Sequence, residues 1–144
     1  MRGEIGEGSR AAGSLPGVMV LDASLAAADV CNLETIGRVS GEPRVVELWF
    51  AAVPEADRIY FLSGGRDAAA WVKNVAANPR VRVEIEGQWF GGVRRWIEGE
   101  EDEPLARRLL AAKYEGWREG RRLSAWARES LPVRVDLEAL GRAP

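Results

Sequence analysis

Histidine is absent from this 144-residue chain, and cysteine occurs only once, at Cys31. Without histidine the chain lacks the commonest general base and the commonest side-chain ligand for zinc or haem, so we expect no metal site. It also cannot build a catalytic Ser-His or Cys-His pair. A single cysteine can form no internal disulfide, which favours a reducing compartment, and we therefore expect a cytoplasmic protein.

Long hydrophobic runs and basic stripes are missing as well. The longest apolar stretches, 17–21 and 45–53, are far shorter than the roughly 20 residues of a membrane-spanning helix. We therefore expect no membrane insertion. The formal net charge is -2, and the arginines are interspersed with glutamates, which argues against a nucleic acid partner.

The length of the chain suits one domain with its own hydrophobic core. Glycine and alanine dominate the first residues, where Glu4 and Glu7 make a poor secretory signal. We expect residues 1–24 to be a flexible N-terminal segment and residues 25–140 to form the folded domain.

Turn signals divide most of the chain into short apolar or alternating runs, as in an antiparallel sheet. The clearest strand is 81–85, where branched apolar residues alternate with charged ones. In the expected strand 88–97, Gly91-Gly92 predicts a bulge or a close backbone approach. We expect strands at 33–39, 43–53, 58–62, 81–85, 88–97 and 133–137, and helices at 68–77, 104–117 and 124–128. This order predicts a small barrel-like α+β domain, mainly β.

The stretch Ser63-Gly64-Gly65 lies between an expected strand and an expected helix. Glycines let the backbone approach a ligand closely, and a helix N-terminus adds uncompensated N–H donors, so a phosphate would suit this place. An ordinary strand-to-helix turn, capped by Asp67, explains the same residues equally well.

Polar residues further along this helix have the same two interpretations. Lys73 and Asn74 could bond a ligand held by the glycine loop, although a solvated helix face is the simpler account. Trp71 is expected to anchor the core. Arg44, on a neighbouring strand, could bind an anion through its fork of donors or pair with nearby glutamates.

Strand residues point alternately to opposite faces, which places Glu47 and Trp49 opposite Leu48 and Phe50. A face with both an acid and an indole is expected to line a pocket or a subunit interface. Tyr114, near the end of a long helix, could donate a proton in a chain without histidine, although packing explains it as readily.

Several segments extend these motifs in a fixed order. They are Thr35-Ile36-Gly37-Arg38, Ser40-Gly41-Glu42-Pro43-Arg44, Glu47-Leu48-Trp49-Phe50, Leu62-Ser63-Gly64-Gly65, Trp71-Val72-Lys73-Asn74, Asn78-Pro79-Arg80-Val81, Leu109-Leu110-Ala111-Ala112-Lys113-Tyr114, Gly116-Trp117 and Leu131-Pro132-Val133. This order resembles the deazaflavin (F420)-dependent nitroreductase and quinone reductase family. That family is a branch of the pyridoxamine 5'-phosphate oxidase-like, FMN-binding split β-barrels. The resemblance covers residues 33–137.

The resemblance implies an α+β, mainly β fold, a six-stranded antiparallel split β-barrel with flanking helices, and usually a homodimer. It implies an oxidoreductase that transfers a hydride from reduced F420 to a small electron-poor acceptor, such as a quinone, a nitro compound or an activated alkene. An FMN-binding oxidoreductase is the alternative, and a flavin or deazaflavin carrier without turnover is a second alternative.

The resemblance also implies a site. The cofactor phosphate is expected against the glycine loop, with support from the helix and from Arg44, and the ring along the strand that carries Trp49. The expected cofactor-binding residues are Arg44, Glu47, Leu48, Trp49, Ser63, Gly64, Gly65, Arg66, Trp71, Lys73 and Asn74. Tyr114 is the expected catalytic proton donor.

Overall fold

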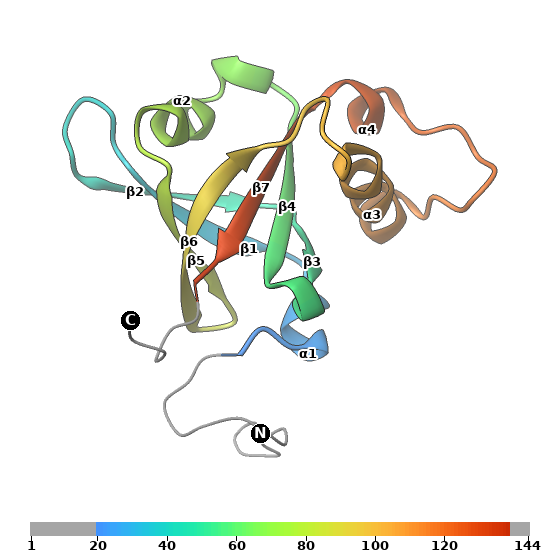
Figure 1. The fold of residues 1–144 in the computed structure, drawn as a ribbon, viewed down its shortest axis with the longest axis horizontal. Coiled ribbons are helices and arrows are strands. Elements are labelled where there is room, and N and C mark those ends of the chain that lie inside the picture. Colours follow the sequence, from blue (N-terminus) through green and yellow to red (C-terminus); the bar gives the residue numbers. More distant parts are fainter. Residues whose placement is uncertain (1–19, 139–144) are drawn as a thin grey trace.

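The computed structural model describes residues 20–138, which fold into one antiparallel sheet flanked by helices (Figure 1). The strands are β1 Cys31–Ile36, β2 Pro43–Leu48, β3 Ala51–Val53, β4 Arg58–Ser63, β5 Arg80–Ile85, β6 Gln88–Trp96 and β7 Leu131–Leu137. The α-helices are α1 Ala23–Ala26, α2 Ala70–Ala77, α3 Glu103–Glu115 and α4 Ala125–Glu129, and two short 3-10 turns are η1 Pro54–Ala56 and η2 Arg66–Ala68. The mainly β, α+β class is confirmed.

The sheet has the strand order β2-β1-β5-β6-β7-β4-β3, so β2 and β3 lie at its two opposite edges. Only Trp49 and Phe50 join these two strands in the chain. A sheet whose two edges are joined by two residues must curl round, and Figure 1 shows the resulting half-barrel. The strand expected at 43–53 is therefore two strands, which raises the count from the expected six to seven.

The apolar residues form two clusters on the two faces of β4. Ile59 and Phe61 pack inside the half-barrel against α1 and α2, while Tyr60 and Leu62 pack outside it against α3. This division follows from the alternation of side chains along a strand. Because both faces of β4 are covered, Ile59 to Ser63 are all buried, and the strand anchors the helices on either side of the sheet.

The helices differ from expectation mainly at their ends. The helix expected at 68–77 starts at Ala70, because η2 intervenes after the glycine pair. Gly116, with φ 67, ends α3 in the left-handed conformation, and the Ser124 side chain caps α4 by accepting from Ala127 N at 3.1 Å. Helix α1 was not expected.

Two sequence expectations concern the ends of this fold and the glycines of β6. The segment expected to be flexible, 1–24, lies outside the described residues except for 20–24, where Leu21 is buried and Asp22 caps α1. In β6, a Cβ on Gly92 would lie 2.6 Å from Val135 Cγ1. The glycine therefore permits the close approach of β6 to β7 that the sequence suggested.

Candidate functional site

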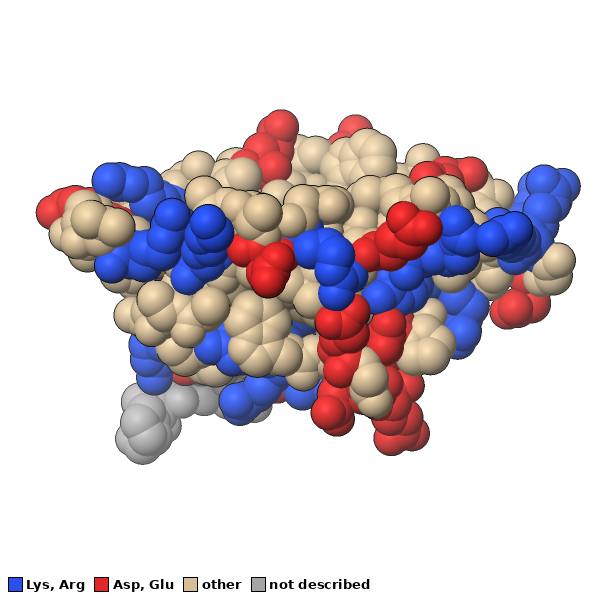
Figure 2. Space-filling view, turned by 90° about the horizontal axis from the view of Figure 1, so that it is seen from above, with Lys and Arg blue, Asp and Glu red and all other residues tan. Residues whose placement is uncertain are grey.

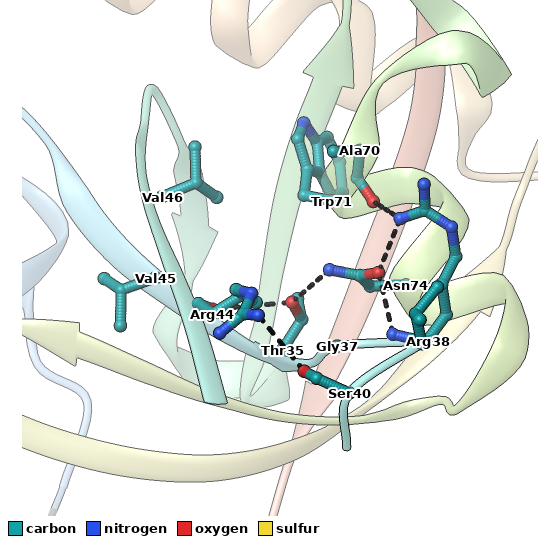
Figure 3. A pocket seen from close by; sticks show the side chains of 11 residues that line it. Thr35, Gly37, Arg38, Ser40, Arg44, Val45, Val46, Ala70, Trp71 and Asn74 are labelled. Carbon is teal, nitrogen blue, oxygen red and sulfur yellow. Dashed lines mark hydrogen bonds between the residues drawn. The ribbon is translucent and has the colours of Figure 1, made fainter. Parts of the chain in front are cut away.

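A cleft of about 560 Å³ lies between the β1–β2 hairpin and α2 (Figure 3). Strands β1 and β2 supply one wall and the first turns of α2 supply the other. The residues that line it are Thr35, Gly37, Arg38, Val39, Ser40, Arg44, Val45, Val46, Ala70, Trp71 and Asn74. The hairpin wall therefore carries both valines and arginines, and α2 contributes the Trp71 indole opposite them.

The buried side chain of Asn74 holds the hairpin against α2. Its Oδ1 accepts from the Arg38 backbone N at 3.2 Å and from Arg38 Nη1 at 2.8 Å, and its Nδ2 donates to Thr35 Oγ1 at 3.1 Å. Thr35 and Asn74 are only 1 % and 5 % exposed. A buried amide that uses both its oxygen and its NH₂ fixes the geometry of the groups around it. Asn74 thus sets the width of the cleft.

Two arginines of the hairpin carry positive charge to the cleft. Arg38 also donates to Ala70 O at 3.5 Å, and Arg44 donates to Ser40 Oγ at 3.1 Å. Among residues 20–138, neither guanidinium pairs with a carboxylate. The β1–β2 hairpin projects at the left of Figure 1, and basic side chains lie at the left end of the molecule in Figure 2 as well. Unneutralised guanidinium groups of this kind suit an anionic ligand.

The N-terminus of α2 adds to this charge. Its N-cap is Ala69, which has no side chain able to cap, so the expected cap by Asp67 is wrong. The first backbone N–H groups of a helix have no partner within it and carry a partial positive charge. Ala70 lines the cleft, so this helix end and the two arginines border the same space.

The glycine loop is occupied by contacts within the protein. Ser63 is 3 % exposed, and its hydroxyl donates to Arg66 O at 2.9 Å. The Arg66 guanidinium donates to the Glu98 carboxylate and to the Glu129 carbonyl. Arg66, with φ 52, is the loop residue in the left-handed conformation, rather than either glycine. Ser63, Gly64, Gly65 and Arg66 do not line the cleft between the hairpin and α2.

Three aromatic residues continue from the β2–β3 junction towards this loop. Trp49, 48 % exposed, stacks on Tyr114 with ring centres 4.4 Å apart and planes 2° from parallel. Trp126 meets Trp49 edge-on at 5.5 Å, and its indole would be 3.6 Å from a Cβ on Gly64. The Trp49 and Trp126 rings are nearly perpendicular, and together with Tyr114 they form an apolar surface beside the glycine loop.

The Tyr114 hydroxyl is bonded to backbone groups. It accepts from Phe50 N at 3.0 Å and lies 2.8 Å from the Asp29 carbonyl, to which it can donate. Burial raises the pKa of Tyr114 above its ordinary value, so the hydroxyl stays protonated at neutral pH. Tyr114 is not among the residues that line the cleft, and its role as proton donor stays a prediction.

The cleft thus brings together Arg44, Trp71 and Asn74 of the expected binding residues. Glu47 and Lys73 are exposed outside it, while Leu48 packs against the core inside the half-barrel. Sequence reasoning missed Thr35, Arg38 and Ser40 as site residues. The available signal was their position in the same hairpin motif as Arg44.

Comparison with known proteins decides the family. The model of the family described as F420H(2)-dependent quinone reductase matches residues 17–138. The chain belongs to the F420H(2)-dependent quinone reductase family. It is an F420-dependent oxidoreductase, and the expected enzyme class and cofactor are confirmed. No curated protein matches the chain in sequence.

Solved structures agree with this membership. A structure described as an F420-H2 dependent reductase is 25% identical, with TM-score 0.57, and the match covers 85% of this chain and 100% of that one. A candidate pyridoxamine 5'-phosphate oxidase from Listeria innocua is 19% identical, with TM-score 0.58 and coverage of 81% and 89%. A third, described as a domain-swapped dimer, is 25% identical, with TM-score 0.56 and coverage of 88% of both chains. The expected split-barrel fold is confirmed.

Proposed function

We propose that this reductase binds F420 in the cleft between the β1–β2 hairpin and α2, and reduces a quinone or another small electron-poor acceptor. One observation carries the proposal: Arg38 and Arg44, unpaired with any acid among residues 20–138, share a cleft of about 560 Å³ with an apolar wall. A deazaflavin with an acidic, phosphate-bearing tail has the matching division into a flat ring and an anionic end. The residues present therefore fit the cofactor.

The anionic tail is assigned to the cationic part of the cleft. Arg38 and Arg44 supply guanidinium donors, and the uncapped start of α2 supplies backbone N–H groups. Asn74 supports them by holding Arg38 in place. Each charge-assisted hydrogen bond of this kind contributes about 1.5–3 kcal/mol.

The ring is assigned to the open edge of β2. Because β2 is an edge strand, half of its backbone N–H and C=O groups have no strand partner and can meet the polar edge of a flat heterocycle. In this arrangement Trp71 forms part of the opposite wall of the cleft. The ring extends along β2 beyond the cleft, towards the segment Glu47, Leu48 and Trp49.

The glycine loop is assigned to the far side of the same site. In this proposal Ser63, Gly64, Gly65 and Arg66 close the space between the ring and α4, and Lys73 provides positive charge from the exposed side of α2. The bound cofactor supplies the hydride. The chain has to hold the ring, exclude water and offer the acceptor a flat apolar surface, for which the half-exposed indole of Trp49 is suited. Tyr114 is retained here as the expected proton donor.

Fluorescence titration with F420 tests the proposal. We expect saturable binding, followed by oxidation of bound F420H2 when a soluble quinone is added. Arg44→Gln is expected to weaken binding, whereas Arg80→Gln, which removes an exposed arginine paired with Glu138 on another part of the sheet, is the matched control. Absence of saturable F420 binding would contradict the proposal. A purified protein with flavin absorbance would favour the FMN alternative.

Two further expectations are part of this proposal. We propose a homodimer, in keeping with the similar structure described as a domain-swapped dimer, and light scattering during gel filtration would measure its mass. A monomer at micromolar concentration would contradict it. Within residues 20–138, no helix has the length and apolar character to cross a membrane. The cytoplasmic location stays a prediction.

A further inference from the structure

The junction between β2 and β3 is held by two adjacent side chains of α3. At this point the chain leaves one edge of the sheet for the other, so the Phe50 backbone loses its strand partners. Its N–H donates to Tyr114 Oη at 3.0 Å, and its C=O accepts from Lys113 Nζ, also at 3.0 Å. Buried backbone groups need such partners, since an unpaired one is costly. Phe50 is 0% exposed, so these bonds satisfy a junction that water does not reach.

Lys113 joins a third segment to the junction. Its Nζ also donates to Ala26 O at 3.1 Å, at the end of α1, and lies 3.8 Å from the centre of the Phe50 ring. These partners are carbonyl oxygens and an aromatic face, and no carboxylate pairs with Lys113 among residues 20–138. Burial lowers the pKa of Lys113, while Cys31 and Asp29, from β1 and the turn before it, act in the opposite direction. The Lys113 ammonium group therefore acts as a hydrogen-bond donor to the backbone of α1 and of the β2–β3 junction.

Tyr114 connects this junction to the indole of Trp49. Its hydroxyl is held by Phe50 and by the Asp29 carbonyl, and its ring lies parallel to the Trp49 ring at 4.4 Å. Trp49 is the residue before Phe50, so both its backbone and its ring plane are set from α3. Its free side remains half exposed, next to Trp126.

We propose that Lys113 and Tyr114 are positioning residues that hold the Trp49 indole in the plane against which the acceptor binds. The inference rests on the proposed function for the identity of the acceptor, and it assigns Tyr114 a different role from the proton donor expected above. In this arrangement the Tyr114 hydroxyl proton points to backbone oxygen, and Trp49 is the side chain that meets the substrate.

The two possible roles of Tyr114 predict different effects when Lys113 is replaced. A proton donor acts through its own hydroxyl, so loss of Lys113 would not imitate loss of Tyr114. A positioning pair acts through one shared junction, so the two losses resemble each other and do not add. Tyr60, the other tyrosine of the chain, provides a matched control because its hydroxyl bonds to Asp102 on the outer side of the sheet.

The experiment compares Tyr114→Phe, Lys113→Met, the double variant, Lys113→Arg and Tyr60→Phe. We expect Tyr114→Phe and Lys113→Met each to raise the KM for a soluble quinone by about 3–10-fold, as for loss of one or two hydrogen bonds, with kcat within about 3-fold. The F420 Kd should stay within about 2-fold. The double variant should resemble the single ones, Lys113→Arg should restore most of the affinity, and Tyr60→Phe should match the wild type.

A second readout does not depend on catalysis. The near-ultraviolet circular dichroism of the Trp49–Tyr114 stack, identified by its loss in Trp49→Phe, should weaken in Lys113→Met even though both rings are still present. If this signal is unchanged in a folded Lys113→Met protein, the positioning role is wrong. Should Lys113→Met not fold, Tyr114→Phe takes its place, because it keeps a ring at position 114 and loses only the hydroxyl bonds to Phe50 and Asp29. An unchanged Trp49 signal and an unchanged KM in that variant would contradict the positioning role.

A proton-donor role for Tyr114 would give a different set of results. A fall in kcat of about 100-fold or more in Tyr114→Phe alone, with a changed pH profile and with Lys113→Met behaving like the wild type, would make Tyr114 a proton donor and overturn the proposal. A wild-type protein that binds no F420 would contradict the proposed function instead. The circular dichroism comparison would still decide whether α3 positions Trp49.

Discussion

The β1–β2 hairpin and the glycine loop both adjoin α2, but they use their arginines in opposite ways. Arg66 of the loop pairs with Glu98 and with a carbonyl of α4, so its charge is compensated within the protein. Arg38 and Arg44 of the hairpin bond to neutral groups and keep their charge at a cleft. The glycine-rich turn thus compensates its arginine within the protein, whereas the hairpin keeps two arginines at a cleft, which is why we propose the hairpin as the place of the anionic tail.

The region around the glycine loop, here called the loop side, also depends on an ion pair between buried Arg107 and partly exposed Glu103. Arg107 is 8 % exposed and donates to Glu103, to Ala127 O at 3.0 Å and to Ser130 O at 2.8 Å. It thereby ties α3 to both ends of the last turn of α4. This last turn is where Arg66 anchors the glycine loop. On the loop side, Arg66 and Arg107 are therefore both paired with carboxylates of the protein.

The largest effect is expected from breaking these contacts at Arg107. Arg107→Met removes the donor of Glu103 Oε2 and of two carbonyls, although Gly99 N still bonds Glu103 Oε1. We expect the free energy of unfolding to fall by about 3 kcal/mol. Urea denaturation measures it. Arg108→Met, one position along α3, is the control for loss of charge alone, with an expected change within about 0.5 kcal/mol. Equal effects of the two variants would contradict the role of the Arg107–Glu103 pair.

On the hairpin side the effect is expected in binding rather than in stability. Arg44 is exposed and its hydrogen bonds are within its own hairpin, so Arg44→Gln should change the free energy of unfolding by less than about 0.5 kcal/mol. The Kd for F420 should rise about 10-fold, with a weaker dependence on salt because one ionic contact is lost. Titrations at two ionic strengths check this. An unchanged Kd would remove Arg44 from the site.

Acid should weaken the loop side more than the hairpin side. The Gly99 backbone N–H, together with Arg107, holds the pKa of Glu103 below its ordinary value of 4.5. A carboxyl whose pKa is lower in the folded state contributes stability above its unfolded pKa, and this stability is lost as the pH falls through the folded pKa. Urea midpoints measured from pH 7 down to pH 3 should therefore fall less steeply in Glu103→Gln than in the wild type. Arg44→Gln should keep the wild-type slope.

The smallest effect is expected at Arg66. Its ion pair with Glu98 joins two half-exposed side chains, and exposed pairs contribute about 0–1 kcal/mol. Arg66→Gln should lower stability by no more than this and leave the F420 Kd within about 3-fold. A loss of affinity greater than that of Arg44→Gln would reverse the comparison and place the tail at the glycine loop.

Local patterns predicted most of the fold. Strand β5 has strict alternation, and α3 has Pro104 in its first turn and Gly116 as its C-cap, so each of these signals lies within or next to the element that it specifies. The break at Trp49 and Phe50 could not be predicted in this way. The sequence there is continuously β-prone, and the break depends on side chains of α3 more than 60 residues away.

In the candidate site, too, local motifs predicted some residues, whereas contacts between distant residues could not be predicted. Arg44, Trp71 and Asn74 were predicted from their motifs, and the structure brings them to one cleft. The bond from Arg38 to Asn74 joins residues 36 positions apart, so no local pattern reveals it. The glycine pair was predicted from its residue type, yet neither glycine has a positive φ. A glycine motif indicates which conformations are available, and the fold decides which residue adopts them.

The central claim is that the F420 tail binds at the hairpin, and a crystal structure of the complex with F420 tests it most directly. We expect the acidic tail within hydrogen-bonding distance of Arg38 or Arg44, with the ring between β2 and Trp71. Density for the tail against Ser63 to Arg66, with Arg66 released from Glu98 and the hairpin arginines unengaged, would contradict the account.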